Sequence, residues 1–111
     1  MKIPKNVIFG CEAEKDKKRI LAALKKDRLL LDVYLITLPE KNGLLEIYPS
    51  YIFTKVDIYK KKNPKVVGIA DGYDEAVDIV STTILDCYNS QGDFDLKKYF
   101  ISWQRKNLKE R

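Results

Sequence analysis

The sequence predicts a single α+β domain over residues 1–111, with helices and strands interleaved along the chain. Three observations support this prediction. Short runs of branched and aromatic residues indicate strands, apolar residues at spacings of three and four indicate helices, and no repeat or linker divides the chain. With 45% hydrophobic and 33% charged residues, the composition is that of one ordered domain.

The first 38 residues predict a strand, a helix and a second strand. Residues 6–10 (NVIFG) form a short apolar run stopped by glycine, and residues 11–26 carry acids in the first turn and lysines in the last, as a helix dipole favours. The run 29–38 (LLLDVYLITL) is apolar on both alternating faces except at Asp32. Such a strand is typical of the centre of a sheet that is covered on both sides.

A hairpin and an ambiguous segment follow. Residues 39–43 form a turn cluster in which Asn42-Gly43 suits positive φ angles, and residues 44–48 return as the second arm. Residues 49–59 alternate as in a strand and also repeat as in a helix. Pro49 suits the first turn of a helix, which favours the helical interpretation.

A strand over residues 65–70 precedes two helices. The first, over residues 73–89, has Asp71 to cap its start and Gly92 to end it. In the second, Asp95 is the expected cap and Phe94 is expected to pack on Tyr99. The apolar face predicted for the first of these helices is Tyr73, Ala76, Val77, Val80, Ile84, Cys87 and Tyr88.

With residues 49–59 as a helix, the first six elements follow a ferredoxin-like βαββαβ order with two C-terminal helices added. With that segment as a strand, the chain is a five-stranded variant. The last helix presents Leu96, Tyr99, Phe100 and Trp103, which is too much aromatic surface to leave in water. We expect this helix to cover the second sheet face, either in its own chain or on the partner of a homodimer.

The sequence predicts a cytoplasmic protein that does not enter a membrane. Its longest apolar stretch, residues 29–38, is about half the roughly 20 residues that span a bilayer, and the amino-terminal residues do not form a signal peptide. Cys11 and Cys87 are therefore expected to stay reduced. The net charge of +5 is uneven, because residues 66–96 hold seven acidic residues and no basic residue.

The absence of histidine removes the commonest general base and metal ligand, and no cofactor is predicted. Cys11 follows a strand and a glycine, a placement that resembles that of the nucleophile in cysteine-dependent phosphatases. Lys17 stands where their phosphate-binding arginine would fall, so we interpret Cys11 as a small, semi-buried residue at a helix start. The acidic residues Asp71, Asp74, Glu75 and Asp78 share one helix face, which we interpret as solvated.

Basic residues gather on two helix faces and in one connector, and phosphate neutralisation needs such clusters. Tyr34, Tyr51, Phe53 and Tyr59 are candidate stacking partners for bases. The candidate nucleic-acid surface comprises Lys15, Lys18, Arg19, Lys60, Lys61, Lys62 and Arg105.

We therefore expect a non-enzymatic binding or regulatory module that acts through contacts with a protein partner of complementary charge, with Leu96, Tyr99, Phe100 and Trp103 as the candidate partner surface. The alternative is a nucleic-acid-binding accessory protein. A third hypothesis is a small enzyme that depends on Cys11 or on carboxylates.

Overall fold

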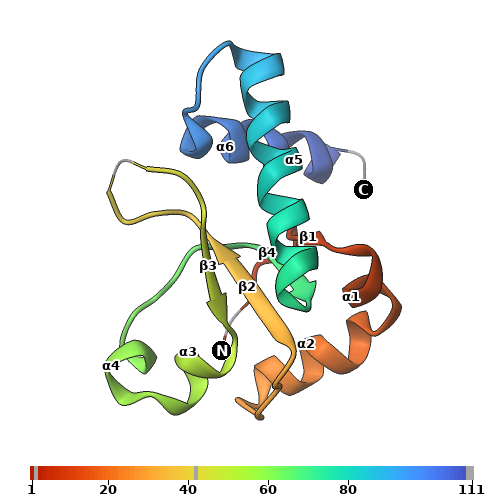
Figure 1. Cartoon of the computed structure of the whole chain (residues 1–111), viewed down its shortest axis with the longest axis vertical. Coiled ribbons are helices and arrows are strands. Elements are labelled where there is room, and N and C mark those ends of the chain that lie inside the picture. Colours follow the sequence, from red (N-terminus) through yellow and green to blue (C-terminus); the bar gives the residue numbers. More distant parts are fainter. Residues whose placement is uncertain (2, 42, 110–111) are drawn as a thin grey trace.

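Four short strands form one mixed sheet in the computed structural model, which describes residues 1, 3–41 and 43–109, with side chains up to residue 103 (Figure 1). The sheet order is β1-β4-β2-β3, with β1 parallel to β4 and the other neighbours antiparallel. The strands are β1 (Ile8–Phe9), β2 (Val33–Thr37), β3 (Glu46–Pro49) and β4 (Val66–Asp71). Strands β4 and β2 are central, as the apolar run that contains β2 predicts.

Helices cover both faces of this sheet. They are α1 (Cys11–Lys15), α2 (Lys17–Lys25), α3 (Tyr51–Lys55), α4 (Asp57–Lys60), α5 (Tyr73–Gln91) and α6 (Leu96–Lys109). Among the described residues, no helix is long and apolar enough to cross a membrane. The prediction of one continuous helix over residues 11–26 is wrong, because Asp16 interrupts the helical conformation between α1 and α2.

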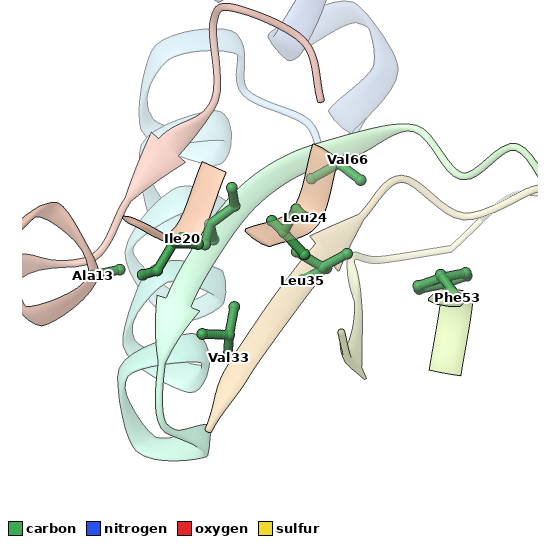
Figure 2. Packing of buried hydrophobic residues seen from close by; sticks show 8 residues of the cluster. Ala13, Ile20, Leu24, Val33, Leu35, Phe53 and Val66 are labelled. Carbon is green, nitrogen blue, oxygen red and sulfur yellow. The ribbon is translucent and has the colours of Figure 1, made fainter. Parts of the chain in front are cut away.

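The alternation of side chains along β2 and β4 creates two hydrophobic clusters. Leu35 and Ile69 point to the cluster that α1, α2 and α3 cover, where Figure 2 shows Phe53 of α3 at one side. Ile36 and Ala70 point to the other cluster, which α5 and α6 cover. The burial of both faces explains why both alternating positions of β2 are apolar.

The order of elements along the chain agrees with the predicted sequence of strands and helices, with α1–α2 and α3–α4 as the two helical connections. The sheet does not confirm a ferredoxin-like arrangement. Strand β1 lies at the edge and pairs directly with β4 in parallel, with the register Ile8 opposite Gly68. The five-stranded variant is wrong, because residues 51–55 and 57–60 are helical.

The predicted caps and turns have mixed outcomes. Gly92 ends α5 at φ 77°, and Asp95 Oδ1 accepts a hydrogen bond from the amide of Lys98 at 3.2 Å, as predicted. Pro49 is the last residue of β3 and does not begin a helix. Asp71 does not cap α5, because it still belongs to β4 and Gly72 occupies the cap position. Asn42 of the predicted hairpin turn lies outside the described residues.

Helix α5 is rotated relative to the predicted apolar face. Its buried residues are Ala76, Ile79, Thr83 and Cys87, whereas Tyr73, Val77 and Tyr88 are exposed. Ala76, Thr83 and Cys87 have small side chains, which let the helix approach its neighbours closely. The larger aromatic residues lie at the margin, where Tyr73 packs on Tyr34 of β2.

Helix α6 docks on its own chain, and Figure 1 shows it crossing the half of α5 that extends beyond the strands. Leu96 and Phe100 are buried there, and Trp103 is half-buried beside Phe100. Phe94 stacks on Tyr88 with ring centroids 5.0 Å apart, so its predicted packing on Tyr99 is wrong. The second sheet face is thus covered by α5 together with α6.

The contact of Tyr99 with α5 predicts a loss of stability at alkaline pH. The Tyr99 hydroxyl donates a hydrogen bond to Asp86 Oδ2, and burial together with this bond raises the pKa of Tyr99 far above its usual range. The contribution of this contact is therefore complete below the unfolded pKa of about 10 and is lost as the pH rises above it.

We expect the free energy of unfolding to fall between pH 8 and pH 11 more steeply in the native chain than in Tyr99→Phe, as measured by urea titration. Other tyrosines and the lysines titrate equally in both proteins, so the difference isolates Tyr99. If the free energy of unfolding fell equally steeply with pH in both proteins, the pKa of Tyr99 would be the same in the folded and the unfolded chain.

Candidate nucleic-acid interface

Three neighbouring hollows lie on the surface around α2, α3 and α4, and basic side chains line each of them. Their volumes are about 310, 590 and 440 Å³. The first and second hollows share Lys26, and the second and third share Lys62. We call this joined surface the basic groove.

Nine basic residues from six separate parts of the chain line the basic groove. The first hollow has Arg19, Lys26 and Arg28. The second has Lys26, Lys55, Lys60 and Lys62. The third has Lys41, Lys62, Lys65 and Lys97. Among the described residues, three acidic ones line the same hollows, namely Asp27, Glu40 and Glu46, so this part of the surface carries an excess of positive charge.

One of these acids is already neutralised within the groove. The ammonium group of Met1 lies 2.7 Å from Asp27 Oδ1. The hydrogen bond from this ammonium holds the pKa of Asp27 below its usual range. Asp27 therefore stays ionised and paired, and it offsets little of the charge of the surrounding lysines.

The lysines of α4 and its carboxyl-terminal connector are held only loosely. Lys60 Nζ lies 3.9 Å from Asp57, and Lys62 Nζ lies 3.9 Å from Glu40. All four side chains are about half exposed or more, and ion pairs of this length and exposure contribute little to stability. Both lysines can therefore exchange a carboxylate for another anion at small cost.

The third hollow has an aromatic wall made by Tyr48, Phe53 and Tyr59. The ring centroids of Tyr48 and Phe53 lie 5.2 Å apart, and that of Tyr59 lies 5.9 Å from Phe53 and 6.2 Å from Tyr48. Phe53 is buried in the core, whereas both tyrosines are half-buried. The core thus supports this wall from behind.

The hydroxyl of Tyr48 donates a hydrogen bond to Glu46 Oε2 at 3.2 Å. Burial, and then this bond to a carboxylate, raises the pKa of Tyr48 above its usual range. Tyr48 is therefore neutral at physiological pH and adds no negative charge to the hollow.

The fold brings together only part of the surface predicted from the sequence. Arg19, Lys60 and Lys62 line the basic groove. Lys15 and Lys18 are exposed on α1 and α2 outside it, and Lys61 is exposed at the end of α4. The side chain of Arg105 lies outside the described residues. Of the predicted stacking partners, Phe53 and Tyr59 belong to the groove, whereas Tyr34 packs on Tyr73 across the sheet.

Six of the nine basic residues were not predicted as part of this surface. They are Lys26, Arg28, Lys41, Lys55, Lys65 and Lys97. Lys26 follows α2, Lys55 ends α3, Lys41 lies in the loop between β2 and β3, and Lys65 precedes β4. They share no spacing in the sequence, in which Lys26 and Lys97 lie 71 positions apart. The sequence signals that do point to the groove are Arg19 on the cationic helix face, the lysine run at residues 60–62, and the aromatic residues Phe53 and Tyr59.

The region around Cys11 has a structural explanation. Cys11 is exposed, which corrects the semi-buried placement, and the thiols of Cys11 and Cys87 are both free. The amides that follow it are already occupied, because Glu75 Oε1 accepts hydrogen bonds from Glu12 N at 3.0 Å and Ala13 N at 3.3 Å. Burial raises the pKa of Cys87, which is a core thiol.

The acidic face of α5 is also different from its prediction. Glu75 turns inward, and its Oε2 accepts a hydrogen bond from Asp71 N at 3.2 Å. Asp74 and Asp78 remain exposed. Among the described residues, no group of three acidic or thiol side chains is arranged to hold a metal ion. The interpretation of all four acids as one solvated face is therefore wrong for Glu75.

No protein-family model, curated protein or solved structure matches this chain.

Proposed function

We propose that this chain is a non-enzymatic binding module that holds a nucleic acid along the basic groove. The observation that supports this proposal is the convergence of nine basic residues, from six parts of the chain, on three joined hollows. Phosphate neutralisation requires lysine and arginine side chains in a continuous track. The loose ion pairs of Lys60 and Lys62 leave both cations able to bind phosphates.

The shape of this surface favours a nucleic acid over a small anion. A single phosphate needs one pocket with converging donors, whereas the basic groove distributes its charge over hollows of about 310, 590 and 440 Å³. Lysine acts as a mobile point charge and suits a backbone with repeated phosphates. An acidic protein segment would also be attracted, and the binding experiment below includes it.

Charge reversal within the groove is expected to weaken the binding of nucleic acid. In fluorescence anisotropy with a labelled 16-nucleotide DNA, as single strand and as duplex at 0.1 M salt, we expect Lys26→Glu/Lys62→Glu to weaken binding more than about tenfold. The slope of log affinity against log salt should also become less negative by about 1.4–1.8, because about two phosphate contacts are lost.

The control is Lys15→Glu/Lys18→Glu, which changes the net charge equally on the exposed face of α1 and α2. We expect less than about a twofold effect at 0.1 M salt, because screening extends over about 10 Å. Equal weakening by both pairs would contradict a defined groove. If the chain bound neither DNA form at 0.05 M salt but bound a poly-glutamate peptide, the proposal of a nucleic-acid ligand would be wrong. The ligand of the groove would then be an acidic protein segment.

A second candidate function, recognition of a protein, is supported by a different surface. Leu85 and Tyr88 of α5 are 61% and 49% exposed one helical turn apart, and Phe94 stacks on Tyr88. Large apolar residues that neighbour one another at the surface are typical of contact sites. We propose this surface, on the face opposite α2 and α3, as the site for a protein partner or a second copy. In the predicted partner surface, Leu96 and Phe100 are buried in this chain, and Tyr99 and Trp103 are half-buried.

A further inference from the structure

We propose that the third hollow of the basic groove binds a nucleobase stacked on Tyr59, so that the groove prefers a single strand to a duplex. This inference rests on the proposed function. The bases of a duplex are stacked on one another inside the helix, whereas an unpaired base can enter a pocket. The hollow, at about 440 Å³, has the size of a site for one small ligand.

The aromatic wall provides the stacking surface. Tyr59 is half-buried and is held by Phe53, whose ring centroid is 5.9 Å away and whose own side chain belongs to the core. A ring that is fixed on one side and accessible on the other loses little freedom when a base stacks on it. Tyr48 extends the same wall, with its ring centroid 6.2 Å from that of Tyr59.

A cation now occupies the position beside this ring. Lys62 Nζ lies 5.1 Å from the ring centroid of Tyr59 and 3.9 Å from Glu40. Both contacts are weak at an exposed site. A base on Tyr59 would displace the ammonium group, which would move to the phosphate of the same nucleotide. The base and the phosphate of one nucleotide would thus bind to Tyr59 and Lys62 respectively, which contact each other in the free protein.

The charges of the hollow also orient the ligand. Glu46 lies at the aromatic wall, where it accepts the hydrogen bond from Tyr48, and Glu40 lies 3.9 Å from Lys62, whose ammonium group contacts Tyr59. Lys41, Lys65 and Lys97 also line the hollow. Phosphates are repelled by the two carboxylates and attracted by the lysines. The uncharged base therefore faces the aromatic and acidic side, and the backbone follows the lysines.

The test compares two 12-nucleotide strands of equal charge, oligo(dT) and the same strand with abasic sites, by fluorescence anisotropy. We expect the native chain to bind oligo(dT) at least about fivefold more tightly than the abasic strand, since one stacked base contributes this much or more. Tyr59→Leu should reduce this ratio to near one, whereas Tyr59→Phe should retain it. Affinity for the abasic strand should be the same in all three proteins, which also verifies that the variants fold.

The outcomes separate the two proposals. Equal binding of both strands by the native chain, or tighter binding of a 12-base-pair duplex than of oligo(dT), would overturn base stacking and leave the groove intact. Absence of binding to every strand at 0.05 M salt would overturn the proposed function itself. A preference for oligo(dT) that persists in Tyr59→Leu would overturn the assignment to Tyr59.

Discussion

Replacement of Gly10 by alanine is expected to destabilise the fold by about 2–3 kcal/mol, the contribution of charge-assisted hydrogen bonds from exposed and partly buried amides to one carboxylate. A Cβ atom on Gly10 would lie 1.6 Å from Glu75 Oε1. The backbone of Gly10, at φ −66° and ψ 162°, is open to any residue, so conformational strain is not the cause. The cost arises because the methyl group displaces the Glu75 carboxylate from the amides of α1.

A double-mutant cycle separates this mechanism from a general loss of packing. Glu75→Ala alone should cost about as much as Gly10→Ala, because it removes the same hydrogen bonds to Glu12 N, Ala13 N and Asp71 N. In the double variant the methyl group has no carboxylate to displace. The loss of stability in the double variant should therefore be about 2 kcal/mol smaller than the sum of the losses in the two single variants. Urea unfolding followed by circular dichroism measures all four proteins.

Gly92→Ala is the matched control. Gly92 adopts φ 77° at the end of α5, and an added Cβ would meet nothing within 4 Å. Its substitution should cost about 1 kcal/mol through backbone strain alone and should add fully to Glu75→Ala. If the stability losses of Gly10→Ala and Glu75→Ala were additive, displacement of the Glu75 carboxylate would not be the cause of the loss in Gly10→Ala.

Local features of this fold could be predicted from the sequence because they depend on neighbouring residues. The strand over residues 65–70, the helix over residues 73–89 and the caps at Gly92 and Asp95 each follow from periodicity or from the conformational preference of one residue. The helical interpretation of residues 49–59 is confirmed within α3 and α4, whereas Pro49 ends β3 and the extended residue Val56 separates the two helices.

The order of the strands could not be predicted in the same way. Strand β1 has only two residues, and its place at the edge depends on a parallel pairing with β4, about 60 positions away. Pairings of this kind are decided by how helices cover the sheet and not by the composition of the strand. The rotation of α5 is also a packing effect, because three of its four buried residues, Ala76, Thr83 and Cys87, are small, whereas the large Tyr73 and Tyr88 are exposed.

The candidate site illustrates the same limit. Lys15 and Lys18 repeat at helical spacing and gave a clear signal, yet the structure places them outside the basic groove. Lys26, Lys41 and Lys97 have no mutual spacing, and the fold places them around neighbouring hollows. Glu75 resembled one more acid on a solvated face, although its partners Glu12 and Ala13 lie more than 60 positions earlier.

Replacement of Phe100 by alanine is expected to destabilise the chain by about 3–5 kcal/mol, as is typical of a buried phenylalanine. Phe100 is 2% exposed and packs in the cluster of Ile36, Val67 and Ile79, beneath α5. Its removal leaves a cavity between α6 and the second sheet face and also removes the ring contacts with Tyr99 and Trp103. Urea unfolding followed by circular dichroism measures the loss.

The control lies one position further along the same helix. Ile101 is 53% exposed, so Ile101→Ala should change stability by less than about 0.5 kcal/mol. If Ile101→Ala were the costly substitution, α6 would dock through its other face. If the loss in Phe100→Ala depended on protein concentration, α6 would instead dock on the sheet of a second copy, because only an intermolecular contact changes with concentration. A loss that is large and independent of concentration identifies α6 as the cover of its own sheet.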